Sequence, residues 1–222
     1  MKLILAALAL ATPMAQPLPA ITAPPAAAVA AGETERLVEL LFPEDRVMET
    51  ALAAVRNDTR RRSELSDDPA MLDFVITQMW PEVSKTMRAA MPELRADLAK
   101  VFTAELTPGE ISDLTIFFSS PAGKKLLAII YEDMAANPAA GTQERTNNAS
   151  DRFMAVLTPD DYPAVTRFAA SGGAAKMQEI GPLLGNASAA WAERLLARHG
   201  PRFATLRTQA IADYKGKQGG GQ

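Results

Sequence analysis

The sequence predicts an all-α protein. From residue 33 to residue 214, apolar residues recur at helical spacing in every window long enough to judge. The same stretch shows no sustained alternation of β-branched residues, which would indicate strands. Capping residues followed by proline mark several helix starts. We therefore expect a single helical bundle over residues 33–215.

The composition is that of an ordinary globular chain, and it excludes several classes of protein. The 222 residues are 48% apolar and carry 23 basic against 26 acidic side chains, which suffices for a core and rules out disorder throughout. The absence of Cys excludes a disulfide framework and a thiolate metal site, and the single His excludes a multi-histidine centre. Scattered basic residues give no electrostatic footprint for nucleic acid. We expect no cofactor, no metal and no nucleic-acid partner.

Residues 1–20 have the pattern of a secretory signal peptide. A short basic start precedes an apolar run over residues 3–11, which is too short to span a bilayer core of roughly 30 Å as a helix. Cleavage fits after Ala15 or Ala20, and we favour Ala20; a retained N-terminal anchor is the alternative. The sequence thus predicts export to the periplasm, or secretion, with no transmembrane segment in the mature chain. Residues 21–32, rich in Pro and Ala, predict a disordered tether.

Two helices are expected at the start of the mature domain. A leucine cluster over residues 37–41 predicts a short first helix. Val47, Ala51 and Val55 follow at i, i+4 and i+8, which places them on one face of a second helix. That helix is predicted to end at the basic triplet of residues 60–62, because a helix C-terminus favours cations.

A proline-containing region follows. Asp68 and Pro69 predict a helix start, with Asp68 as the cap and Pro69 at the first helical position. Pro81 is expected to kink or break this helix, and Pro92 is expected to open a further segment. The apolar faces of the two segments comprise Leu72, Val75, Ile76, Met79 and Val83, followed by Leu94, Leu98, Val101 and Phe102.

Residues 108–136 are predicted to form a tight αα-hairpin. Thr107 is a cap with a proline after it, and Glu110 at the third helical position completes a capping box. Ser120 and Pro121 stop this short helix and start the next one. The expected buried residues are Ile111, Leu114 and Phe118 in the first helix and Leu126, Leu127, Ile130 and Met134 in the second.

The chain contains a degenerate internal repeat with units of about residues 92–136 and 143–199. After a shift of 51 positions, the stretch from Phe102 to Leu126 shows nine identities in 25 aligned positions. Any two capped helix starts share a Thr-Pro pair, but this does not explain the equal distances to a Phe, a Ser and a Lys. We therefore expect a bundle built from two copies of an αα-hairpin unit. The matching pairs include Thr107/Thr158, Pro108/Pro159, Glu110/Asp161, Phe117/Phe168, Ser120/Ser171 and Lys125/Lys176.

One late helix closes the domain. It carries Trp191, Leu195 and Leu196, and it is predicted to end at His199 because a Gly-Pro pair follows. Residues 216–222, rich in Gly and Lys, are expected to form a disordered tail.

A compact motif lies between Leu106 and Leu127. It consists of a Leu-Thr-Pro helix start, an aromatic pair at Phe117 and Phe118, and a Ser-Pro-x-Gly-x-Lys run. These features resemble the signature of the domain-of-unknown-function 2059 family. The resemblance implies a small helical domain of an exported bacterial protein, and it implies no catalytic residue.

Most residues of this motif have a structural explanation. The threonine, first proline and glutamate start a helix, and the aromatic pair fills the core of the helix pair. The serine and second proline start the return helix, and the glycine permits close helix approach. The residues with such a structural role are Thr107, Pro108, Glu110, Phe117, Ser120, Pro121 and Gly123.

Lys124 and Lys125 are the members of the motif that this explanation omits. In the first turn of a helix they oppose its dipole, at a cost of a few tenths of a kcal/mol each if exposed. One interpretation is that they are simply solvated. The other is that they belong, with Arg60, Arg61 and Arg62, to an anion-binding spot for a lipid headgroup or a glycan carboxylate.

The sequence favours a non-catalytic binding or interaction module of the bacterial envelope. It contains no recognisable catalytic motif. The expected partner is an envelope protein, a lipid or a cell-wall polymer, held in a groove between the two hairpins. The alternative is a cell-wall hydrolase or lyase that uses one buried carboxylate with a raised pKa, and Glu132 and Glu179 are the first candidates for it.

Overall fold

The structure of the chain, a computed structural model, describes residues 27–60, 65, 67–136 and 142–219. Within these ranges every regular element is a helix, so the all-α prediction is confirmed. The predicted signal peptide lies outside the described residues, as do Arg61 and Arg62. The elements are α1 (Ala27–Leu41), α2 (Glu44–Arg60), α3 (Pro69–Glu105), α4 (Pro108–Ser119), α5 (Pro121–Ala136), α6 (Thr142–Val156), the 3-10 helix η2 (Pro159–Asp161), α7 (Tyr162–Ala169) and α8 (Gly172–Gly219).

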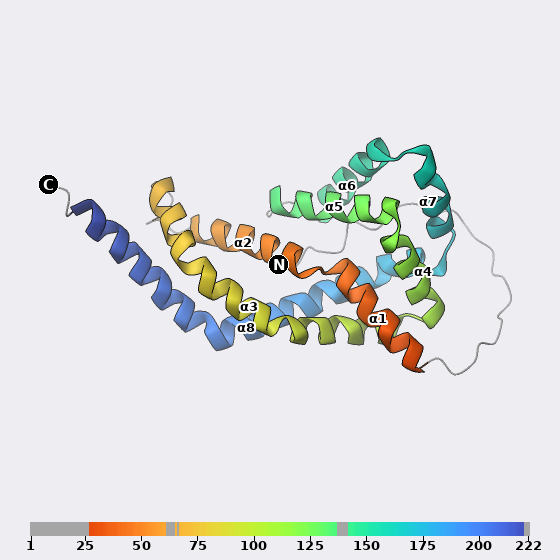
Figure 1. The fold of residues 1–222 in the computed structure, drawn as a ribbon, viewed down its shortest axis with the longest axis horizontal. Coiled ribbons are helices and arrows are strands. Elements are labelled where there is room, and N and C mark those ends of the chain that lie inside the picture. The colour runs from red at the N-terminus through yellow and green to blue at the C-terminus, as the bar shows by residue number, and fades with distance from the viewer. Residues whose placement is uncertain (1–26, 61–64, 66, 137–141, 220–222) are drawn as a thin grey trace.

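Two long helices, α3 and α8, form the spine of the fold. They lie side by side and make the most extensive helix-to-helix contact in the described chain (Figure 1). Helices α1 and α2 pack on α3, and α5 packs against α6. Helix α4 contacts α1, α5 and α8, so it joins the N-terminal helices to the second half of the chain.

Helix α3 runs without interruption from Pro69 to Glu105, through Pro81 and Pro92. The prediction that Pro92 opens a separate helix is therefore wrong. A proline inside a helix removes one backbone hydrogen bond and costs about 3 kcal/mol or more. The buried face of α3 continues across both prolines, with Met87 buried between them, and this packing outweighs the local cost. Figure 1 shows that α3 changes direction along its length, which is how a helix accommodates proline.

Helix α8 also continues through two prolines, Pro182 and Pro201, and it reaches Gly219. The predicted helix end at His199 is therefore wrong. The predicted disordered tail at residues 216–222 is wrong as far as residue 219, because residues 216–219 are helical. The Gly-Pro pair that suggests a helix end from local preference does not end this helix.

The last turns of α8 are held by contacts with the first turns of α3. Ala210 is buried, and the Tyr214 ring lies 5.5 Å from the ring of Phe74, measured between centroids. This apolar contact stabilises the helix beyond its internal proline, which explains why the local stop signal fails.

Helix α1 is longer than predicted. It begins at Ala27, so residues 27–32 are helical, although the sequence predicts disorder over residues 21–32. Alanine is the best helix former, and this segment leads directly into turns whose side chains, such as Leu37, are buried. The helix that the buried turns stabilise therefore continues toward the N-terminus through residues 27–32, which contain no helix-breaking proline.

Helices α4 and α5 begin at the predicted residues, Pro108 and Pro121. The Thr107 cap and its capping box with Glu110 are present. The single residue between the two helices is Ser120, which has an extended backbone conformation. In Figure 1 the two helices meet at a corner and do not lie antiparallel, so the expected tight hairpin is wrong in its geometry. One extended residue is too short to bring the second helix back along the first.

The core consists mainly of the positions that helical spacing predicts. Leu196 is an exception, with 58% of its surface exposed on α8, and Val47, Val55, Val101 and Leu127 are only partly buried. The predicted core residues that are buried in the structure include Leu72, Val75, Ile76, Met79, Val83, Leu94, Leu98, Phe102, Ile111, Leu114, Phe118, Leu126, Ile130, Met134, Trp191 and Leu195.

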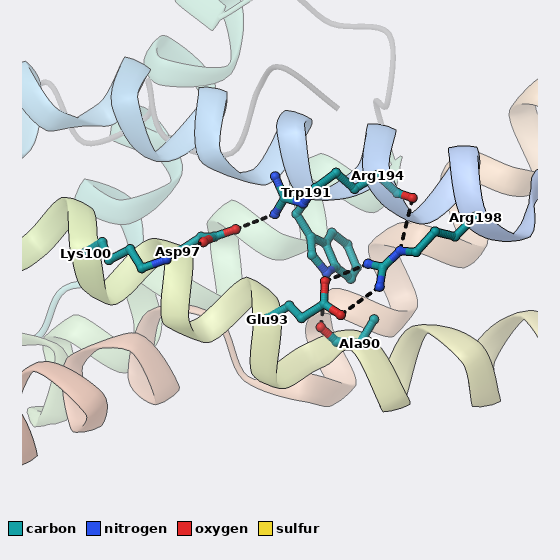
Figure 2. A network of polar contacts seen from close by, with 7 residues as sticks. All are labelled: Ala90, Glu93, Asp97, Lys100, Trp191, Arg194 and Arg198. Carbon is teal, nitrogen blue, oxygen red and sulfur yellow. Dashed lines mark hydrogen bonds and ion pairs between the residues drawn. The ribbon is translucent and has the colours of Figure 1, made fainter.

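A polar seam ties α8 to α3 around one buried tryptophan (Figure 2). The Trp191 indole is fully buried, and its Nε1 donates to the backbone oxygen of Ala90 at 3.1 Å. Arg198 holds the Glu93 carboxylate through two hydrogen bonds of 2.9 and 2.6 Å. The ion pair between Arg198 and Glu93 is exposed, so it adds little to the free energy of unfolding. The buried indole of Trp191 is therefore the main stabilising contact of the seam.

We expect Trp191→Ala to destabilise the fold by about 3–5 kcal/mol, because it removes a fully buried ring and its hydrogen bond from the main helix contact. The free energy of unfolding from urea titrations followed by circular dichroism measures this loss. Leu196→Ala on the same helix is the control and should change stability by less than about 0.5 kcal/mol, because that side chain is mostly exposed. Equal effects of the two substitutions would contradict the role given to Trp191.

Candidate functional site

Two parts of the fold are candidates for a functional site: the contact between the two predicted repeat units, and a groove between α2, α3 and α8. The element ends of the two units differ by the predicted 51 residues, since α3 ends at residue 105 and α6 at 156, while α5 begins at 121 and α8 at 172. The contact between the units was the site expected from the sequence. The groove between α2, α3 and α8 was not predicted from the sequence.

The helix starts of the two predicted units share the hydrogen bonds from a threonine to a carboxylate three residues later. The Thr107 backbone N–H donates to Glu110 Oε2 at 2.7 Å, and the Thr158 N–H donates to Asp161 Oδ2 at 2.8 Å. The Asp161 carboxylate also accepts a hydrogen bond of 2.7 Å from the Thr158 hydroxyl. Both carboxylates therefore cap the first turn of a helix that begins with proline.

The return helices of the two units also start alike. The Ser120 hydroxyl donates to the Phe117 carbonyl oxygen at 2.6 Å, and the Ser171 hydroxyl donates to the Phe168 carbonyl oxygen at 2.8 Å. Each Ser Oγ then accepts the backbone N–H three residues later, at 3.1 and 3.3 Å. These hydroxyls are occupied by local bonds and serve helix capping.

The two units meet through their aromatic residues. The rings of Phe117 and Phe168 stack with centroids 3.9 Å apart and an angle of 6° between their planes. Phe118 packs edge-on against both rings. Phe117 and Phe168 are the positions that the predicted shift of 51 residues matches, so the stack joins the two predicted units.

An ion pair crosses the same contact. Lys125 Nζ lies 2.6 Å from Asp161 Oδ2 and donates to the Val156 carbonyl oxygen at 3.3 Å. The Lys125 ammonium and the hydrogen bonds from Thr158 lower the pKa of the buried Asp161 carboxyl to about 2. In the other direction, the pKa of Lys176 is raised mainly by its hydrogen bond with Glu179, with a further contribution from Glu110 of the first unit. Each unit thus sets a lysine near the capping carboxylate of the other.

The structure does not assemble the predicted anion-binding spot. Lys125 is already bonded to a carboxylate, while Lys124 is exposed and forms no ion pair within the described ranges. Arg60 ends α2, and Figure 1 shows that this end lies far from the start of α5, where the lysines are. Arg61 and Arg62 fall outside the described residues.

Gly123 has the role predicted for it. A Cβ at this position would lie 2.1 Å from the Phe117 carbonyl oxygen and 2.6 Å from the Phe118 Cα, distances that real Cβ atoms do not adopt. The contact is with backbone, so no side chain can move aside. Only glycine lets α5 start this close to the end of α4.

A cavity of about 300 Å³ lies beside the aromatic stack and is lined by both units. Asp113 lines it, and burial together with the nearby Glu110 carboxylate raises the pKa of Asp113. Arg167 lines the other side and is exposed. Ser120 and Ser171 also line the cavity, and each hydroxyl donates to a backbone carbonyl oxygen of its own unit and not to a general base.

Glu132 and Glu179 do not have the surroundings that a carboxylate catalyst requires. Each side chain is more than half exposed, and each forms an ion pair of 2.5 Å, with Arg152 and Lys176 respectively. The hydrolase alternative needs a carboxylate buried in a cleft, and both of these side chains lie at the surface. Neither residue supports the hydrolase alternative.

The larger feature is an open apolar groove of about 760 Å³. Its floor is α3, with Met79, Val83 and Met87, and its two walls are α2 and α8. The walls carry small side chains where large ones would close the space. The small wall residues are Ala51 and Ala54 on α2 and Ala189, Ala192, Gly200 and Ala204 on α8.

Exposed and partly buried apolar side chains also line the groove. Leu196 projects from the α8 wall with more than half of its surface exposed, and Phe203 and Val55 are partly buried. The charged residues that line it are Asp58, Glu193 and Arg207. One sequence pattern could have indicated this site, namely the recurrence of Ala and Gly on one face of α8. The sequence gives no indication that α2 lies across from that face.

Two further features bear on function. No helix in the described ranges is both long and apolar enough to cross a bilayer. Among the same residues, no group of three or more His, Asp or Glu side chains is arranged to hold a metal ion.

Comparison with protein families finds one match. Residues 92–152 match the model of a family described as "Uncharacterized protein conserved in bacteria (DUF2059)", which confirms the resemblance seen in the motif. No curated protein and no solved structure matches the chain. The matched segment covers residues 92–136, the first of the two predicted units. The residues that line the large groove lie before residue 92 or after residue 152.

We expect Lys125→Met to raise the pKa of Asp161 from about 2 toward its usual range, because the ammonium at 2.6 Å is the contact that lowers this pKa most.

The lowered pKa of Asp161 also predicts how the stability of the fold depends on pH. The stabilisation from this contact is complete above the ordinary Asp pKa of about 3.9 and is lost as pH falls through about 2. The side-chain carboxyl 13C shift of Asp161, followed through an acid titration, measures the midpoint. Lys124→Met is the matched control, and an equal shift in both variants would show that the pair is not the cause.

We expect Gly123→Ala to destabilise the fold by roughly 1–3 kcal/mol, because the new Cβ would overlap the backbone of Phe117 and Phe118. Gly109→Ala in the first turn of α4 is the control, since a Cβ there meets nothing closer than the Thr107 hydroxyl at 4.0 Å. The control should be neutral or slightly stabilising. Thermal unfolding of both variants checks the difference, and a stable Gly123→Ala protein would argue against the close approach.

Proposed function

We propose that the protein is an exported, non-catalytic binding module of the bacterial envelope that takes an apolar ligand into the groove between α2, α3 and α8. The groove itself carries this proposal. Small-molecule sites are usually concave, mostly apolar and about 300–1,000 Å³ in volume, with a few polar groups at defined places. The groove has a volume of about 760 Å³ and charged residues at three positions of a mainly apolar lining.

The energetics of the lining support a ligand. Leu196 exposes 58% of its surface in a region where neighbouring side chains are also apolar. Exposed apolar area costs about 25 cal/mol per Å² relative to burial, so an apolar ligand that covers the lining gains free energy. Both walls of the groove are attached to its floor, because α2 and α8 each pack on α3.

The cellular location in this proposal, the bacterial envelope, is inferred from the sequence. Residues 1–20 have the pattern of a signal peptide, and the matched family is bacterial. The two capped units at residues 92–136 and 143–199 are, in the same proposal, degenerate copies that arose by duplication, which the equivalent hydrogen bonds and the stacked phenylalanines support. Their mutual contact serves the fold, and the ligand site lies elsewhere.

The test uses the neutral dye Nile red, whose fluorescence rises in apolar surroundings, and variants that fill the groove. Ala54→Trp should weaken dye binding at least tenfold, because Ala54 lines the groove. Ala53→Trp is the matched control and should bind within twofold of the unmodified chain, because Ala53 is its neighbour in α2 and does not line the groove. Fluorescence titration gives the affinities, and the melting temperature of each variant shows whether it is folded. Absence of dye binding, or equal binding by folded Ala54→Trp, would overturn the proposal.

A further inference from the structure

We infer that the ligand of the groove is a fatty acid, with its acyl chain along the apolar lining and its carboxylate at Arg207. This inference rests on the proposed function and names the ligand class of that site. Arg207 lies on α8 at one end of the lining and is partly buried. It is the cationic side chain among the described residues that line the groove.

Arg207 differs from the other arginines of α8 in its pairing. Arg194, Arg198 and Arg202 follow at i, i+4 and i+8 and pair with acidic residues of α3, namely Asp97, Glu93 and Glu82. Arg207 comes five residues after Arg202, so it leaves that face of the helix, and it forms no ion pair within the described part of the chain. An anionic ligand group would give Arg207 the kind of partner that the other three arginines have on α3. A carboxylate suits the planar guanidinium because it can accept two parallel hydrogen bonds.

The acidic residues of the lining favour one orientation of the ligand. Glu193 lies fourteen residues before Arg207, which corresponds to about 21 Å along α8 at 1.5 Å per residue. It repels a carboxylate from that end of the groove. Asp58 also lines the groove, on the α2 wall, and has a polar interaction of its own. The carboxylate is therefore attracted to one end and the methyl end of the chain lies toward the other.

The apolar lining is long enough to hold one acyl chain. The apolar side chains that α8 contributes lie between Ala189 and Ala204, which corresponds to about 22 Å along the helix. One acyl chain of a bilayer lipid spans about 15 Å, half of a hydrocarbon core of roughly 30 Å. A single cation at one end of a lining of this length matches a single-chain amphiphile with one anionic group.

The experiment compares three probes of equal chain length: myristate, its methyl ester and tetradecanol. Each displaces Nile red from the full chain, from Arg207→Gln and from Arg167→Gln. The last variant is the matched control, because Arg167 is an exposed arginine that lines the small cavity between the repeat units and not the groove. We expect myristate to displace the dye at a concentration at least tenfold lower than either neutral probe. Arg207→Gln should remove this difference, and Arg167→Gln should keep it.

The other outcomes separate this inference from the proposed function. If all three probes displace the dye equally, the groove binds apolar chains but Arg207 does not select a carboxylate, and only the present inference fails. If anionic phosphatidylglycerol vesicles compete at lower concentration than myristate, the ligand carries a phosphate head and the fatty acid assignment is wrong. If the dye itself does not bind, the groove does not take small apolar ligands. Its occupant would then be a protein segment or a second copy of the chain, and both the proposed function and the fatty acid assignment fail.

Discussion

The packing of α3 along α8 is the contact on which the rest of the structure depends. Each helix contains two prolines, and each would break if only local preferences acted. They stay continuous because each provides the apolar surface that the other buries, with Trp191 bonded to Ala90 at the centre. Helix α2 packs on α3 through a separate contact, and residues of α2, α3 and α8 together line the groove.

The contact between the repeat units gives Lys125 a structural explanation that the sequence alone did not supply. Its ammonium bonds the carboxylate that caps the other unit, thirty-six residues away. A lysine near a helix start opposes the helix dipole, but at this position it meets a buried carboxylate with a pKa of about 2. The electrostatic cost to its own helix is offset by the gain at the neighbouring one, so the position needs no external anion.

Features fixed by neighbours in the sequence were predictable, and features fixed by distant contacts were not. The caps at Asp68 and Thr107 and the close approach at Gly123 depend on residues within a few positions, and the structure has all three. The helix breaks expected at Pro92 and after His199 are absent, because packing between distant helices outweighs a local cost. The partner of Lys125 and the groove depend on how helices meet in space, which periodicity does not specify.

The groove is not a necessary result of packing three helices. Large apolar side chains at Ala54 and Ala192 would fill the space between α2 and α8 and bury Leu196, as core residues do elsewhere in the fold. The chain instead has small residues on both walls and an unpaired arginine at one end, where α8 otherwise pairs its arginines with α3. An apolar chain with an anionic end would cover the exposed apolar lining and give Arg207 a partner. A ligand of that kind accounts for the two features together, whereas imperfect packing accounts for the small residues but not for Arg207.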